Sequence, residues 1–194
     1  DGTAIQVANP GLDAETSTNV DVGLRVSVAR VEAEWFYFRN NLKDGILTRP
    51  TGRTIGRLAE FQNINVERLR TSGHEATLRV DLGRGFDLNT NYTKLQTKNP
   101  DRPDIPVAGT YSSKLNAALG YRPRGGRFWA EGAVRRQGEQ QDINLGTSPI
   151  GSVLPAFTIV NVRGGVRLAT IAGRPQEVGL GINNLGNAPY AEAA

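Results

Sequence analysis

The sequence has no cysteine and only one histidine, His74, among its 194 residues. Without cysteine, neither disulfide bonds nor thiolate metal sites can stabilise the fold. A lone histidine has no second histidine or cysteine with which to form a metal site, and Ser72, His74 and Asp81 on one strand do not make a catalytic triad. We therefore expect no catalytic residues, no metal site and no cofactor, so the protein is not expected to be an enzyme.

Long apolar runs and clustered charges are also missing. No segment approaches the roughly 20 apolar residues that a membrane-spanning helix requires, and the mean hydropathy is -0.38. A membrane β-barrel is not excluded, because its spanning strands are short and only half apolar. The 23 basic residues outnumber the 19 acidic ones, which gives a net charge of +4, but they are scattered along the chain. We therefore expect no nucleic-acid partner.

Alternation of apolar and polar residues is what the sequence has instead. In Thr18–Val28 every second residue is valine or leucine, and most of the residues between them are polar. A strand points successive side chains to opposite faces, so such a segment has one apolar face and one polar face. Eight segments are predicted to be strands: Thr18–Val28, Val31–Leu42, His74–Leu82, Phe86–Gln96, Tyr111–Tyr121, Arg127–Gln137, Thr158–Leu168 and Gln176–Asn183. Val31–Leu42 is the exception to the alternation, because Trp35, Phe36, Tyr37 and Phe38 place aromatic rings on both faces and leave its period ambiguous.

The connections between the predicted strands alternate in length. Short turns follow the first, third, fifth and seventh strands, whereas long connections follow the second, fourth and sixth, over about Leu47–Ala59, Asn99–Thr110 and Ile143–Ala156. Short turns at one rim and long loops at the other are typical of outer-membrane barrels, whereas sandwiches usually mix loop lengths at both ends. Most segments also reach the length of about 9 to 11 residues that a tilted strand needs to cross a bilayer. The pattern alone leaves a soluble β-sandwich open as the alternative fold.

Three motifs resemble those of the TonB-dependent outer-membrane receptors. The segment Asn9–Arg25, NPGLDAETSTNVDVGLR, is similar to the NPxLxPETS segment that leads into a barrel strand in that family, with Ala14 in place of the second proline. RTSGHEATLRVDL resembles the family's GVE or GFE strand through Gly73 and Glu75, with His74 in place of the usual apolar residue. GINNLGNAPYAE resembles the NNLFDKxY segment before the last strand. The motifs occur in the family's order, so the resemblance extends over nearly the whole chain.

This resemblance implies both a fold and a function. The fold is expected to be all-β: an antiparallel transmembrane β-barrel, of which residues 1–194 form the C-terminal portion, about eight of 22 strands. The family's N-terminal plug domain and last strand would lie outside this sequence, which reads as part of a longer chain. The resemblance further implies a receptor of the bacterial outer membrane that imports a scarce nutrient, most often a ferric siderophore. TonB would drive transport through the missing N-terminal region.

The resemblance also assigns the two faces of each strand. The valine and leucine face would contact lipid, and polar residues such as Arg25, Arg79 and Arg163 would line the interior. Arg136 falls on the lipid side, far enough along its strand to reach the outer interface. His74 is interpreted as a residue of the lumen rim or of a strand surface. Near the short turns we predict an aromatic girdle formed by Trp35, Tyr37, Tyr121, Phe128 and Trp129.

The long connection over Leu47–Ala59 carries the candidate ligand-binding residues, Arg49, Arg53 and Arg57. Outward loops on a rigid barrel are where ligands are captured, and guanidinium groups attract an anionic iron chelate. The alternative is that these arginines pair with lipopolysaccharide phosphates or keep the loop solvated. The expected partners are therefore outer-membrane lipid, lipopolysaccharide, TonB and a small nutrient ligand. A passive porin or surface adhesin barrel, or a soluble β-sandwich binding module, remains the alternative function.

Overall fold

The structure is a computed structural model that describes residues 4–65, 68–101, 103–104, 107, 110–141 and 153–190. None of these residues forms a helix that is long and apolar enough to span a bilayer. The regular elements among them are strands: β1 (Ala4–Val7), β2 (Thr16–Val28), β3 (Val31–Lys43), β4 (Ile46–Ile55), β5 (Leu58–Asn65), β6 (Leu69–Gly83), β7 (Phe86–Lys98), β8 (Thr110–Tyr111), β9 (Ser113–Tyr121), β10 (Phe128–Gln137), β11 (Gln140–Gln141), β12 (Val153–Leu154), β13 (Phe157–Ile171) and β14 (Arg174–Ile182).

The chain divides into two compact units. As far as the structure describes them, the first unit comprises Asp1–Val20, Arg39–Ser72 and Thr97–Pro106, and the second comprises Asp21–Phe38, Gly73–Gln96 and Val107–Ala194. Strands β2, β3, β6 and β7 contribute residues to both units. The first unit contains a three-stranded sheet of β1, β5 and β4, and the second contains most of an eight-stranded sheet.

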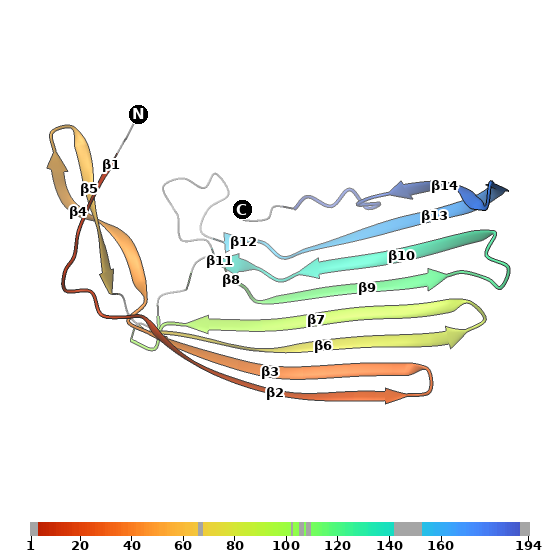
Figure 1. The fold of residues 1–194 in the computed structure, drawn as a ribbon, viewed down its shortest axis with the longest axis horizontal. Coiled ribbons are helices and arrows are strands. Elements are labelled where there is room, and N and C mark those ends of the chain that lie inside the picture. Colours follow the sequence, from red (N-terminus) through yellow and green to blue (C-terminus); the bar gives the residue numbers. More distant parts are fainter. Residues whose placement is uncertain are drawn as a thin grey trace. The chain divides into compact units, whose positions relative to one another are not determined.

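The eight-stranded sheet has the strand order β14-β13-β10-β9-β7-β6-β3-β2, so its strands follow one another as they do in the chain. Neighbouring strands are antiparallel; for example, Gly132 of β10 lies opposite Leu119 of β9 and Val162 of β13. Figure 1 shows the short turns β2–β3, β6–β7, β9–β10 and β13–β14 side by side at one end of this sheet. The alternating pattern therefore predicted these eight strands and their short turns correctly.

The two faces of the eight-stranded sheet differ in polarity. One face, here called the apolar face, presents valine and leucine side chains that stay exposed, including Leu24 at 63% and Leu180 at 83%. Among the described hydrophobic residues, those that are buried are Leu154, Phe157 and Ile159. The protein itself therefore covers little of the apolar face, and such a surface requires an apolar phase or another chain against it.

The opposite face of the sheet, here called the polar face, carries ion pairs between neighbouring strands. Arginine and glutamate side chains that point to the same side of adjacent strands are close enough to pair across them. The pairs are Arg25 Nε with Glu34 Oε1 at 2.7 Å, Arg79 Nη1 with Glu32 Oε2 at 3.7 Å, and Arg163 Nη2 with Glu131 Oε1 at 2.8 Å. Arg25, Arg79 and Arg163 thus lie on the polar side, as the alternation predicted.

Glycines on the polar face lie beneath aromatic rings from adjacent strands. The pairs are Phe36 over Gly23, Phe38 over Gly73 and Trp129 over Gly165. A β-carbon at Gly73 or Gly165 would lie only 2.7 Å from the ring above it, so the close contact requires glycine at these positions. A ring seated over a strand glycine covers backbone that has no side chain of its own.

The aromatic girdle predicted near the short turns is only partly correct. On the apolar face, the Tyr121 ring lies 4.4 Å from Phe86 and 5.8 Å from Phe128, measured between centroids. Trp129 was predicted to belong to the girdle, but it lies on the polar face, where its Nε1 donates a hydrogen bond to Glu177 Oε1 at 2.5 Å. The girdle on β7, β9 and β10 therefore consists of Phe86, Tyr121 and Phe128.

The single histidine lies on the apolar face rather than at a polar rim. The centroid of the His74 ring is 5.6 Å from that of Trp35 and 5.2 Å from that of Tyr37, and the Trp35 contact is a stacked one. Both aromatic residues belong to β3, next to β6 in the sheet. His74 is thus a member of an aromatic cluster, which agrees with the strand-surface interpretation.

The NNLGNAPY motif folds back beside β13. Asn184 N donates to Asn161 Oδ1 at 2.8 Å, and the Asn184 side chain exchanges two 2.9 Å hydrogen bonds with the backbone of Ala188. Asn184 has a positive φ of 51°, a conformation that asparagine tolerates better than most residues. The fold-back places the Tyr190 ring 5.0 Å from that of Phe157. The positive φ angle and the two side-chain hydrogen bonds to Ala188 both favour asparagine at position 184.

Candidate ligand-binding surface

The connection predicted as a long loop over about Leu47–Ala59 is the hairpin β4–β5. Ile55 lies opposite Leu58 at its tip, and the strand register shifts around Gly52. Gly52 and Gly56 have positive φ angles of 79° and 65°, which glycine adopts without strain. Glycine and proline are frequent in turns, and in this segment they hide the period of two that would have predicted these strands.

The NPGL segment before β2 is held against the hairpin by asparagine side chains. Asn9 Oδ1 accepts a hydrogen bond from Gly11 N at 3.1 Å, which closes a tight turn, and Asn9 Nδ2 donates to the backbone oxygen of Asn63 at 2.9 Å. Gln62 Nε2 donates to the backbone oxygen of Ala8 at 2.9 Å. Amides suit this task because each one carries both a donor and an acceptor for the backbone.

Asn65, the last residue of β5, fixes two more segments of the first unit. Its Oδ1 accepts from Asp13 N at 2.8 Å, and its Nδ2 donates to the backbone oxygens of Asp13 at 2.9 Å and Asp44 at 2.7 Å. Glu15 Oε2 accepts from Ile46 N at 3.2 Å at the start of the hairpin. These residues were missed from the sequence because their partners lie up to 52 positions away. The only local signal is the run of amides in FQNIN.

The three predicted ligand-binding arginines all lie on this hairpin and are exposed. Arg49 lies on β4 opposite Gln62, Arg53 follows the irregular residue Gly52, and Arg57 lies in the turn at the tip. Within the described part of the chain, none of the three guanidinium groups has an ion-pair partner. The structure therefore places three uncompensated positive charges on one hairpin, where an anion can reach them.

The carboxylate of Glu60, on the same hairpin, is hydrogen-bonded to a threonine. Glu60 Oε1 accepts a hydrogen bond from Thr51 Oγ1 at 2.9 Å. Because Thr51 holds the carboxylate in place, Glu60 makes no ion pair with the arginines around it in the residues that the structure describes. The hairpin therefore keeps a net positive charge.

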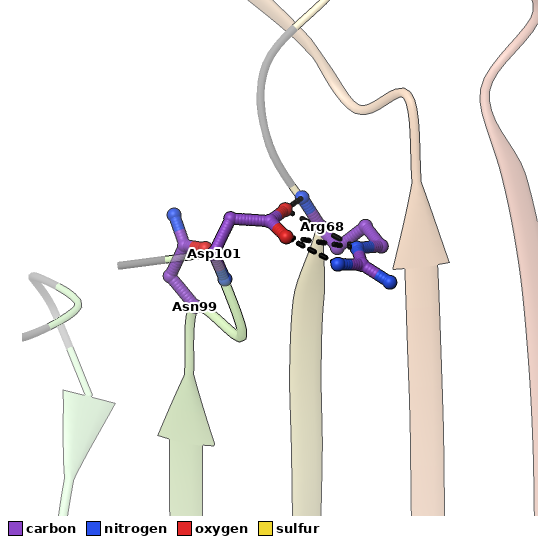
Figure 2. Close-up of polar contacts among 3 residues, drawn as sticks. All are labelled: Arg68, Asn99 and Asp101. Atoms are coloured by element: carbon purple, nitrogen blue, oxygen red, sulfur yellow. Dashed lines mark hydrogen bonds and ion pairs between the residues drawn. The ribbon is translucent and has the colours of Figure 1, made fainter. Parts of the chain in front are cut away.

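The second predicted long connection begins with an ion pair that joins the ends of β6 and β7. Figure 2 shows the Arg68 guanidinium and backbone NH directed at the Asp101 carboxylate, with Asn99 beside them. Arg68 Nε donates to Asp101 Oδ1 at 3.1 Å, and Asn99 Oδ1 accepts from Asp101 N at 2.9 Å. The side-chain hydrogen bond from Arg68 holds the pKa of the Asp101 carboxyl below its ordinary value. Of the third long connection, Ile143–Ala156, residues 143–152 lie outside the described part.

The Arg68–Asp101 pair is expected to weaken in acid. A carboxyl with a lowered pKa stabilises the folded contact above its ordinary pKa, about 3.9, and this stabilisation is lost as the pH falls through the lowered value. Titration of the Asp101 carboxyl carbon by NMR should therefore give a midpoint below about 3.9. Arg68→Gln should return the midpoint to the ordinary value, and an unchanged midpoint would show that the pair is not formed.

In the residues that the structure describes, no three histidine, aspartate or glutamate side chains are grouped so that they could hold a metal ion. The chemistry that the hairpin offers is therefore that of arginine side chains, which bind anions through charge and paired NH donors.

Comparison with known proteins agrees with this architecture. A family model for the TonB dependent receptor-like β-barrel matches residues 1–185. The chain belongs to the TonB-dependent receptor family. Members of this family are transport receptors of the bacterial outer membrane, and barrel strands of this kind present an apolar face to lipid and a polar face to the interior. The soluble sandwich, left open by the sequence pattern, is thereby excluded.

Individual relatives of this receptor chain include iron transporters. It is 32% identical over 123 residues to a ferric enterobactin receptor of Pseudomonas aeruginosa, a match that covers 59% of the chain and 16% of that protein. A crystal structure of a mutant of the Pseudomonas aeruginosa receptor in complex with enterobactin has a TM-score of 0.73 at 27% identity, covering 93% of the chain and 27% of that structure. The FrpB iron transporter of Neisseria meningitidis has a TM-score of 0.73 at 17% identity, covering 98% and 30%, and shows the same fold.

The receptor chain is short beside these relatives. The chain covers 16% of the length of the curated relative. It covers 27% and 30% of the chains in the two solved structures, which is less than a third of each. An open sheet of eight strands is consistent with one part of such a barrel.

Proposed function

We propose that this chain is the C-terminal portion of the barrel of a receptor that imports a ferric siderophore across the outer membrane, with energy supplied through TonB. The exposed arginines Arg49, Arg53 and Arg57 are the residues that would attract the ligand. An iron(III) chelate whose oxygen donors carry more charge than the metal is an anion, and three unpaired guanidinium groups on one hairpin favour such a ligand. Three exposed arginines on one hairpin, without an ion-pair partner among the described residues, are the observation that carries the proposal.

The relatives support this ligand class. The 32% identical protein is a ferric enterobactin receptor, and a structure of that receptor has been solved with enterobactin bound. TonB would act on the region before this part of the barrel, and lipopolysaccharide and outer-membrane lipid would surround its apolar face. The competing role for the three arginines is to pair with lipopolysaccharide phosphates. The experiment below separates the two roles.

Replacing the three arginines by glutamine is expected to weaken binding of a ferric siderophore to the complete receptor about tenfold. Each exposed charge contributes on the order of 0.5 kcal/mol, because solvent screens it. Binding is measured by titrating the purified receptor with ferric enterobactin and following the quenching of its tryptophan fluorescence. The loss should shrink at high salt, because exposed charges are screened there.

A charge-matched control distinguishes binding at the hairpin from the long-range electrostatic attraction of the whole protein. Lys43, Lys94 and Lys98 are exposed and lie outside the hairpin, so their replacement by glutamine removes the same charge and should leave the affinity within about twofold. An equal loss in both variants would indicate long-range attraction only. Unchanged affinity in the arginine variant, with weaker binding of lipopolysaccharide, would assign the hairpin to lipopolysaccharide and overturn the proposal.

A further inference from the structure

Each short turn of the eight-stranded sheet carries or adjoins an arginine. Arg30 lies in the β2–β3 turn, Arg84 in the β6–β7 turn and Arg124 in the β9–β10 turn, while Arg174 directly follows the β13–β14 turn. The residues of these four turns, all of which the structure describes, include no aspartate or glutamate. The four turns lie together at one end of the sheet (Figure 1). Their arginines therefore give that end a rim of positive charge.

The arginines of this rim differ from those inside the strands in how they are paired. Three strand arginines on the polar face, Arg25, Arg79 and Arg163, have glutamate partners, whereas Arg30, Arg84 and Arg124 make no ion pair with any residue that the structure describes. The nearby carboxylate of Asp81 accepts a hydrogen bond from Gly83 N at 2.7 Å instead. The charge of the rim is thus left for a partner outside the protein.

Three of the turn arginines surround one hollow. Arg30, Arg84 and Arg124, together with Leu82 and Gly83, line an open space of about 490 Å³. Guanidinium groups bind phosphate through paired NH donors, and several of them around one space suit a phosphate better than a single one does. Leu82 gives the same hollow an apolar wall.

The apolar wall continues onto the lipid-facing side of the sheet. Leu82 is 53% exposed on the apolar face, and the girdle residues Phe86, Tyr121 and Phe128 begin beside the same turns. Aromatic girdles mark the level at which the headgroups of a bilayer meet the acyl chains. The hollow therefore lies where a lipid phosphate would lie, next to the surface along which acyl chains run.

We propose that this hollow binds the headgroup of an anionic phospholipid of the periplasmic leaflet, with its phosphate between Arg30, Arg84 and Arg124 and an acyl chain against Leu82. Short turns of outer-membrane barrels face the periplasm, which fixes the leaflet. Basic pockets at a membrane surface select anionic headgroups in the same manner. A free phosphate would satisfy the guanidinium groups but would leave Leu82 without an apolar partner, so a lipid fits the hollow better.

The test uses the complete receptor in detergent, with bound lipid counted by native mass spectrometry. Phosphatidylglycerol should bind more tightly than phosphatidylcholine, because only the former carries net negative charge. Replacing Arg30, Arg84 and Arg124 by glutamine should weaken phosphatidylglycerol binding at least about tenfold, since each basic residue at a membrane surface contributes about fivefold in affinity. Replacing the three by lysine keeps the charge but not the paired donors, and should give an intermediate loss.

The Lys43, Lys94 and Lys98 variant described above is the charge-matched control and should bind phosphatidylglycerol as the unmodified receptor does. Equal binding of the two lipids, or an unchanged preference in the glutamine variant, would overturn the proposal. Competition by millimolar inorganic phosphate as effective as that by phosphatidylglycerol would assign the hollow to free phosphate instead. The proposal rests on the outer-membrane location and not on the hairpin ligand, so the siderophore and lipid experiments fail independently.

Discussion

Replacing Gly73 by valine is expected to destabilise the barrel by about 3 kcal/mol, at the upper end of the range for overpacked sites. A β-carbon at this position would overlap the backbone oxygen of Lys94 and lie 2.7 Å from the Phe38 ring. Backbone cannot move aside as a side chain can, so the strands themselves would have to separate. The free energy of unfolding of the complete receptor in detergent, from urea titration followed by tryptophan fluorescence, measures the effect.

Two further variants test whether close packing is the cause. Gly132 lies on the apolar face with no atom within 4 Å of where its β-carbon would be, so Gly132→Val should change the stability by less than about 0.5 kcal/mol. At Gly23 the three atoms nearest to a β-carbon all belong to the Phe36 ring, so Phe36→Ala should rescue Gly23→Val. Phe38→Ala should not rescue Gly73→Val, because the Lys94 oxygen stays in place. Rescue at both sites would contradict the assigned role of the backbone.

Replacing Val134 by arginine is expected to cost about 2 to 4 kcal/mol, the penalty for arginine at a lipid-facing position near the bilayer midplane. Val134 lies on the apolar face, six residues into β10 from the short turn. Its neighbour Ala133 lies at nearly the same depth on the polar face, opposite Ala118 of β9 and Asn161 of β13. Ala133→Arg adds the same charge in a place that water reaches, so it is the matched control and should be tolerated.

Urea unfolding of the two arginine variants in lipid vesicles measures this difference. If Val134→Arg and Ala133→Arg lose equal stability, the assignment of the two faces is wrong. A larger loss for Ala133→Arg would mean that the polar face is the one turned to lipid. Detergent alone would not be sufficient, because a micelle adapts its thickness to a buried charge more easily than a bilayer does.

The sequence predicted the eight-stranded sheet well because the alternation in its strands is a local property. In Thr18–Val28 and most of the other segments apolar and polar residues alternate, and no distant partner is needed to recognise that pattern. Val31–Leu42 is the exception, because its aromatic residues on both faces leave the period ambiguous. Trp129 shows the limit of classifying a residue by type alone. Its position between Phe128 and Ala130 places it on the polar face, where it covers Gly165, although aromatic residues near turns are typical of a girdle.

The candidate site was predictable only in part. The arginines of the β4–β5 hairpin stand out in the sequence, but their strands do not, because Gly52 and Gly56 interrupt the period of two. The amide contacts of Asn65 depend on segments that fold together from distant parts of the chain, and no local pattern encodes them. The positive rim at the short turns was also missed, because its arginines come from separate turns and gather only when the strands pair.

The rings seated over glycines have a consequence for assembly of the sheet. Adjacent strands can in principle pair in several registers, and a slip by one residue turns every side chain to the opposite face. Phe36 over Gly23, Phe38 over Gly73 and Trp129 over Gly165 each require a large residue and an empty position to meet at one offset. A slip by two residues, which keeps the same faces together, would place Trp129 opposite Arg163 or Arg167 instead of Gly165. These three contacts therefore favour the native register and disfavour incorrectly paired strands during assembly of the barrel.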